Sequence, residues 1–142
     1  MNQEIKDFKD LLVWRKAIAL AKEIYHLSRR FPAEERYGLT AQVRRAAVSV
    51  SSNIAEGHAR QGSEFGHFLS IARGSLAEVE SQLLLAVELE FLPLEAVSPV
   101  LLLASEIRRM AASLAQKVSS HSRAAVSSAP SSRPAGDTKP AF

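Results

Sequence analysis

The sequence predicts an all-α protein, an antiparallel up-down-up-down four-helix bundle with a disordered C-terminal tail. Three observations predict this fold. Four segments repeat apolar residues at intervals of three and four, the spacing of one helix face. Short breaks rich in Pro or Gly separate the segments, at Phe31-Pro32, at 57–63 and at 92–99. No stretch of useful length alternates apolar and polar residues as a strand would, and helices joined by short loops pack antiparallel.

The first helix is predicted over 11–30 and carries two apolar stripes that lie about 110° apart. One stripe contains Leu11, Trp14, Ile18, Ala21 and Tyr25. The other contains Val13, Ala17, Leu20, Ile24, Leu27 and Phe31. Because a bundle core covers an apolar arc only a little wider than 100°, one stripe must be covered by something else.

The second helix is predicted over 34–59, since Pro32 and the acidic pair Glu34 and Glu35 suit a first turn. Its second half is small and polar, which permits close approach of a neighbouring helix. The residues concerned are Ala46, Ser49, Ser51, Ser52 and Asn53.

The third and fourth helices are predicted over 63–91 and 98–118. Ser63 is the expected N-cap of the third helix, whose outer face is acidic. Ser98 and Pro99 have the usual order of an N-cap followed by a first helical proline. Residues 1–118 therefore form the predicted domain, and 119–142, rich in Ser, Ala and Pro, form the predicted disordered tail.

The composition indicates a soluble, cytoplasmic protein. The chain has no cysteine, which excludes disulfides and thiolate metal sites. Its N-terminal segment lacks the apolar core of a signal peptide, and its apolar runs are too short to span a bilayer, so no membrane association is expected. Charge is unevenly spread: residues 1–60 carry 11 basic and 7 acidic groups, whereas 61–118 carry 4 and 7.

One long motif is more specific than bundle patterning. It runs from Phe31 to Ala46 (FPAEERYGLTAQVRRA) and continues through Ser49 to the NIAEG segment at 53–57. The segments FKDLLVWRKA at 8–17 and ARGSLAE at 72–78 accompany it. Over residues 8–115 the chain resembles the S23 ribosomal protein-like family, bacterial four-helix bundles first noticed as reading frames within 23S ribosomal RNA intervening sequences.

That family is also similar to the accessory variability determinant proteins of diversity-generating retroelements, which form pentameric rings and bind a reverse transcriptase and nucleic acid. The resemblance implies a homopentamer that binds RNA or DNA and a protein partner. Two features depart from the family pattern: Ser51 stands where relatives often have proline in the second helix, and the tail has no counterpart.

Six residues form the densest polar cluster of the motif: Arg45, Ser49, Asn53, Glu56, Arg73 and Glu78. In an antiparallel hairpin that turns near Gln61-Gly62, Arg45 falls opposite Glu78. A structural ion pair between these two is favoured over a ligand site.

Three pairs of adjacent arginines are candidate phosphate contacts, and oligomerisation would multiply them into a ring. They are Arg29, Arg30, Arg44, Arg45, Arg108 and Arg109. The alternative is that they are solvated or form ion pairs between subunits.

Neither a metal site nor a catalytic site is predicted. His58 and His67 lie near Glu56 and Glu64, but their spacing matches no standard ligand motif. No nucleophile motif or phosphate-binding loop is present, so neither an enzyme nor a cofactor is expected.

A closed homo-oligomer is expected to cover the surplus stripe of the first helix. The interface is then formed either by Trp14, Ile18 and Tyr25 or by Leu20, Ile24 and Leu27, depending on which stripe faces the core. The favoured function is a non-enzymatic oligomeric adaptor that binds RNA, a protein partner or both. The alternative is a purely structural, self-assembling bundle without nucleic-acid binding.

Overall fold

The structure, a computed structural model, describes residues 4–128, and of 122–128 it describes the backbone alone. Within this range the chain forms four α-helices, two short 3-10 helices and no strand. The elements are η1 (Phe8–Asp10), α1 (Leu12–Ser28), η2 (Ala33–Tyr37), α2 (Leu39–Arg60), α3 (Gly62–Glu88) and α4 (Leu94–Ser128).

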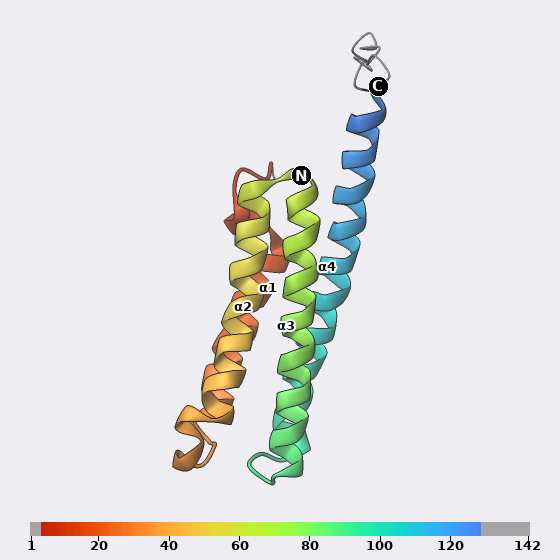
Figure 1. The fold of residues 1–142 in the computed structure, drawn as a ribbon. Helices are drawn as coiled ribbons and strands as arrows, with labels where there is room; N and C mark the ends of the chain where they lie inside the picture. The colour runs from red at the N-terminus through yellow and green to blue at the C-terminus, as the bar shows by residue number, and fades with distance from the viewer. Residues whose placement is uncertain (1–3, 129–142) are drawn as a thin grey trace, which may run out of the picture.

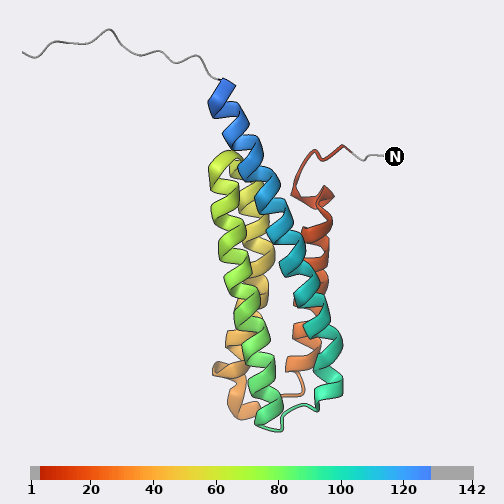
Figure 2. The same ribbon diagram turned by 90° about the vertical axis from the view of Figure 1, so that its right-hand side faces the viewer.

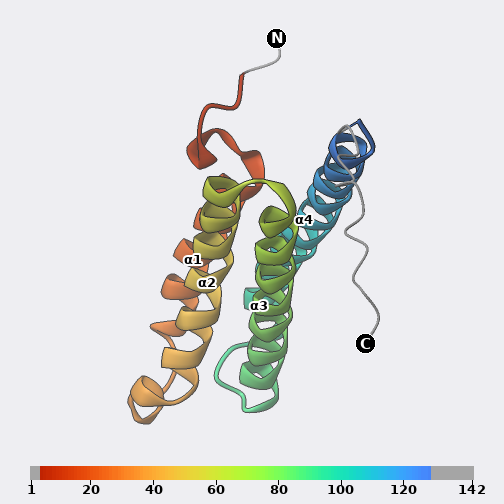
Figure 3. The ribbon, with the colours of Figure 1, turned by 45° about the horizontal axis from the view of Figure 1, so that its top comes forward.

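Consecutive helices run in opposite directions, as Figures 1 and 2 show. Each helix packs against the helices next to it in sequence, and α4 also closes against α1, with the most extensive contact between α2 and α3. The all-α, antiparallel four-helix bundle predicted from the sequence is therefore confirmed. Figure 3 shows that the C-terminal part of α4 stands apart from the other three helices.

The start of the second helix differs from the prediction. Residues 33–37 form the 3-10 helix η2, and α2 begins only at Leu39. The Glu35 carboxylate accepts a hydrogen bond from the Leu39 backbone N–H at 2.8 Å. It thereby satisfies one of the N–H groups that a helix start leaves without a partner. Glu35 caps α2 instead of lying within its first turn.

The later boundaries also differ. Gln61, with φ 59°, is the residue that precedes α3, so Ser63 lies inside that helix and is not its N-cap. Helix α3 ends at Glu88 instead of 91. The chain then turns and restarts at Leu94, which places Ser98 and Pro99 inside α4, where the Ser98 hydroxyl donates to the Leu94 carbonyl at 2.8 Å.

Helix α4 is also longer than predicted, since it continues to Ser128 instead of ending at 118. Its last turns project beyond the α2–α3 turn (Figure 2). The rest of the predicted disordered tail, residues 129–142, lies outside the described residues.

The burial of side chains shows which stripe of α1 faces the core. Leu20 and Ile24 are fully buried, and Leu27 is partly buried against the core. The alternative in which these three residues form the subunit interface is therefore wrong. Ile18 and Tyr25, on the other stripe, keep 42% and 41% of their surface exposed.

A close approach fixes how α2 packs on α3. Gly57 is buried on α2, and a Cβ added there would lie 2.8 Å from the Phe68 Cβ and 3.3 Å from the Phe65 carbonyl oxygen. Helix α2 also runs without a break through Ser51.

Replacing Gly57 by alanine should destabilise the fold by about 1–3 kcal/mol, because overpacking outweighs the gain in helix propensity. Gly74 is the matched control, since a Cβ there meets nothing within 4 Å. Gly74→Ala should stabilise the protein by about 0.5–1 kcal/mol. Urea denaturation measures both changes, and equal gains in stability would contradict the close approach.

Candidate nucleic-acid interface

Five arginines gather where α1 ends and α2 begins. We call this set the basic end: Arg29, Arg30, Arg36, Arg44 and Arg45. It lies at the lower end of the bundle in Figure 1. All but the half-buried Arg44 are exposed. Among side chains of residues 4–121, no ion pair within 4 Å joins any of the five to a carboxylate.

Arg44 is held against α1 by two contacts. Its guanidinium carbon lies 4.6 Å from the centre of the Tyr25 ring, and its Nε donates to the Ser28 hydroxyl at 2.8 Å. Arg44 therefore ties the start of α2 to the end of α1, and it is less free to contact phosphate than its exposed neighbours.

A cleft of about 440 Å³ opens beside this contact. Its lining comes from α1, η2 and α2: Tyr25, Arg36, Tyr37, Thr40, Ala41, Arg44, Arg45 and Val48. Sequence reasoning missed Arg36 and Tyr37. The signal that would have found them is the pair of an arginine and an aromatic residue in the turn immediately before Gly38.

The other two candidate arginines lie elsewhere. Arg108 Nη1 donates to both carboxylate oxygens of Glu80 on α3 at 2.7 Å, and Arg109 donates to the Ser105 hydroxyl at 3.1 Å. This part of α4 lies beside the first half of α1, where Lys16 pairs with Glu106 at 2.7 Å. The structure thus separates Arg108 and Arg109 from the four candidate arginines of the basic end.

The predicted polar cluster is only partly assembled. The Ser49 and Ser75 hydroxyls are 2.8 Å apart across α2 and α3, and Asn53 donates its amide to the Ser49 carbonyl and hydroxyl at 2.8 and 3.0 Å. This contact has the register expected for the hairpin. Glu56, however, pairs with Arg60 at 3.0 Å, and Arg73 is exposed.

The predicted ion pair between Arg45 and Glu78 does not form within 4 Å in the described part of the chain. Both residues are exposed and line opposite sides of a groove of about 320 Å³, together with Gln42, Ala46, Ser49, Ser75 and Gln82. Because both side chains are exposed to solvent there, closing the ion pair would gain little free energy. The carbonyl oxygen of the Gln82 side chain is buried in the same region without a hydrogen-bond partner.

The histidines considered as metal ligands pack against aromatic rings. The His58 ring meets Phe65 edge-on at 5.7 Å, and His67 meets Phe68 at 5.6 Å. In the part of the chain that the structure describes, no three His, Cys, Asp or Glu residues are placed to hold a metal ion.

The second stripe of α1 is partly uncovered: Leu11 is buried and Trp14 and Ala21 pack partly against the core, whereas Ile18 and Tyr25 are exposed. Trp14 is half-buried and meets Phe8 edge-on at 5.1 Å, whereas Ile18 and Tyr25 are more open. Val48 of α2, 43% exposed, lines the Tyr25 cleft. Trp14, Ile18 and Tyr25 thus remain the predicted interface residues.

Comparison with known proteins decides the family. The model of the 23S rRNA-intervening sequence protein family matches residues 9–113. The chain belongs to this family. The matched region begins within η1, covers α1, α2 and α3, and includes residues 94–113 of α4, so it ends before the projecting turns of α4.

A solved structure shares the fold of this 23S rRNA-intervening sequence protein. It is a protein of unknown function from the S23 ribosomal protein family of Bacteroides thetaiotaomicron. The TM-score is 0.68 at 24% sequence identity, covering 73% of this chain and 98% of the other. No curated protein matches the chain. No helix within residues 4–128 is long and apolar enough to cross a membrane.

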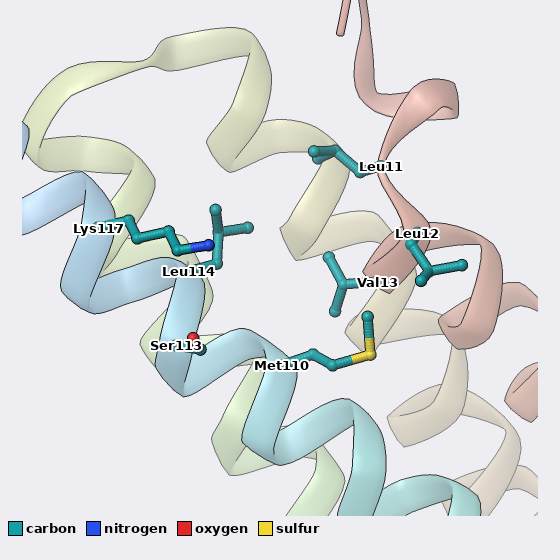
Figure 4. Close-up of a pocket in the computed structure, with 7 residues that line it drawn as sticks. All are labelled: Leu11, Leu12, Val13, Met110, Ser113, Leu114 and Lys117. Atoms are coloured by element: carbon teal, nitrogen blue, oxygen red, sulfur yellow. The ribbon is translucent and has the colours of Figure 1, made fainter. Parts of the chain in front are cut away.

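This chain has a second groove, of about 270 Å³, between the start of α1 and the middle of α4. Figure 4 shows Met110 reaching toward Val13 across it, with Leu114 beside them. The groove is largely apolar, and Lys117 lies along its rim (Figure 4). It marks the place where α4 begins to leave α1.

The ion pair between Arg108 and Glu80 should couple α3 to α4. Both side chains are partly screened by solvent, with 41% and 24% of their surface exposed, so a coupling energy of about 1 kcal/mol is expected. A double-mutant cycle with Arg108→Gln and Glu80→Gln measures it by urea denaturation. The matched control is the more exposed pair of Arg60 and Glu56, which should couple less. Absence of coupling between Arg108 and Glu80 would contradict a stabilising role for Glu80.

Proposed function

We propose that this protein is a non-enzymatic adaptor that assembles as a homo-oligomer and binds structured RNA through its basic end. The resemblance noted from the sequence favours a homopentamer. A protein partner bound by the same assembly is part of the proposal.

The observation that carries RNA binding is that arginines without a carboxylate partner are gathered at the basic end. Lys16, Arg60 and Arg108 each lie within 4 Å of a carboxylate. At the basic end, by contrast, the exposed Arg29 and Arg30 have no such partner among residues 4–121. Guanidinium groups that no carboxylate neutralises are suited to phosphate, and each contact releases counterions from the nucleic acid.

The uncovered stripe of α1 supports self-assembly. Trp14, Ile18 and Tyr25 follow one another along one face of α1, and Tyr25, at the end of this face, also lines the cleft beside the basic end, so the interface is centred on Trp14 and Ile18. A contiguous apolar surface of this kind is typical of an interface. A ring of identical subunits would also repeat the basic end several times, so that modest contacts act together on one RNA.

The second candidate function is a structural, self-assembling bundle that binds no nucleic acid. The same apolar surface favours it, but it leaves the arginines of the basic end without a role. Nucleic-acid binding therefore separates the two candidates.

Filter binding with fragments of 23S ribosomal RNA at increasing salt tests the adaptor function. The expected result is a linear fall of log affinity with log salt. Arg29→Gln with Arg30→Gln should weaken binding and reduce the slope by roughly 0.7 to 0.9 for each lost phosphate contact.

The control is Arg60→Gln, because Arg60 already pairs with Glu56 and Glu64 at the opposite end of the bundle. This variant should bind like the unaltered protein. Absence of salt-dependent binding by the unaltered protein would reject the adaptor and leave the structural bundle.

Self-assembly is tested by placing a charge on either stripe of α1. Ile18→Glu should give a folded but smaller species, because Ile18 is 42% exposed and its stripe faces the predicted interface. Leu20→Glu should unfold the chain, because Leu20 is fully buried and a lone buried charge is costly. Sedimentation and circular dichroism report size and helicity. An Ile18→Glu protein of unchanged size would contradict the interface.

A further inference from the structure

We propose that the cleft between α1, η2 and α2 holds an unpaired nucleotide of the bound RNA, with its base stacked on the Tyr37 ring. This inference rests on the proposed function, since it names the part of the RNA that the basic end recognises. It goes beyond phosphate binding because it predicts a preference for single-stranded over fully paired RNA.

Tyr37 is placed as a stacking platform. Its side chain is 85% exposed, more than any other large apolar side chain that the structure describes. The Arg36 guanidinium carbon lies 5.5 Å from its ring centre. Single-stranded RNA is recognised largely by stacking of bases on aromatic rings and on guanidinium planes.

The turn that carries Tyr37 is held in shape by its own hydrogen bonds. The Glu35 N–H donates to the Pro32 carbonyl, and the Gly38 N–H donates to the Glu35 carbonyl, both at 2.9 Å. The Glu35 carboxylate is occupied by the Leu39 N–H at 2.8 Å. Tyr37 therefore projects from a turn whose backbone is held by hydrogen bonds, and this lowers the entropic cost of ordering the turn on binding.

The cleft has the size and the charge for a nucleotide. Its volume of about 440 Å³ lies within the range of roughly 300–1,000 Å³ that is usual for small-molecule sites. Thr40, Ala41 and Val48 are its smaller lining residues, which leave room for a base. Arg36, Arg44 and Arg45 also line it, and no carboxylate does, so the cleft favours an anionic ligand.

The pairing state of the RNA follows from this geometry. In a duplex, each base is stacked between its neighbours and offers no free face to Tyr37. An unpaired base can turn outward onto the ring while its phosphate meets Arg36 or Arg45. Loops, bulges and single-stranded ends are therefore the expected ligands.

The test compares Tyr37→Leu with Tyr37→Phe in the full-length protein. Fluorescence anisotropy is measured with a labelled single-stranded oligoadenylate and with a blunt RNA duplex of equal length. Tyr37→Leu should bind the single strand about 5- to 150-fold more weakly, the loss expected for one stacked base. Tyr37→Phe should retain affinity, because the ring is kept, and duplex binding should change little in either variant.

Because Tyr37 is exposed, neither substitution should unfold the chain, and circular dichroism of each variant checks this. If the unaltered protein binds 23S ribosomal RNA fragments but not the single strand, the stacking site is overturned; if it binds none of these RNAs, the proposed function itself fails. If it binds RNA but Tyr37→Leu binds the single strand as tightly as the unaltered protein, the stacking site is overturned while the adaptor function stands.

Discussion

The constraint on which this structure depends is that α1 has more apolar surface than one bundle can cover. The core takes the stripe that contains Leu20 and Ile24, both fully buried. The stripe with Ile18 and Tyr25 is left more than 40% exposed at those two residues. Fully burying a large apolar side chain is worth about 1.5–3 kcal/mol, so covering the exposed part of Ile18 and Tyr25 favours association with a second copy of the chain.

The charges are arranged around that same helix pair. Five arginines lie where α1 ends and α2 begins. Arg44 joins the two helices, because its guanidinium lies over the Tyr25 ring and its Nε donates to the Ser28 hydroxyl. Elsewhere, some basic groups pair with carboxylates, as Arg108 does with Glu80 between α3 and α4 and Lys16 with Glu106 between α1 and α4. Arg108 therefore joins α3 to α4, whereas the exposed Arg29 and Arg30 at the basic end have no carboxylate within 4 Å among residues 4–121 and are available to phosphate.

Much of the fold was predictable from the sequence because helical periodicity and Pro or Gly breaks are local signals. The α2–α3 register was predictable too, and the hydrogen bond between Ser49 and Ser75 lies in the predicted register. The partners of exposed charged side chains were not predictable, as Arg45 and Glu78 show. The helix register fixes which backbone positions lie opposite each other, but water competes with a partner for an exposed side chain. The inward stripe of α1 was also undecided, since both stripes carry large apolar residues and only packing against α2 and α4 distinguishes them.

Ends of helices were harder to predict than their existence. The Ser98-Pro99 pair has the pattern of a helix start, yet α4 begins at Leu94, where the Ala96 N–H bonds the Pro93 carbonyl at 3.0 Å. The cleft at Tyr37 was missed because its lining comes from three elements. Tyr25, Tyr37 and Val48 are brought together only by the turn of η2 and the packing of α2 on α1.

The central claim is that another copy of the chain covers the exposed part of the second stripe of α1. The mass of the unaltered, full-length protein in solution tests this claim most directly, because in a monomer that part of the stripe would stay in water. Multi-angle light scattering at micromolar concentration measures this mass without assuming a shape. We expect a mass of two or more chains of 15.5 kDa each, with a homopentamer favoured. A single species of 15.5 kDa would contradict the claim.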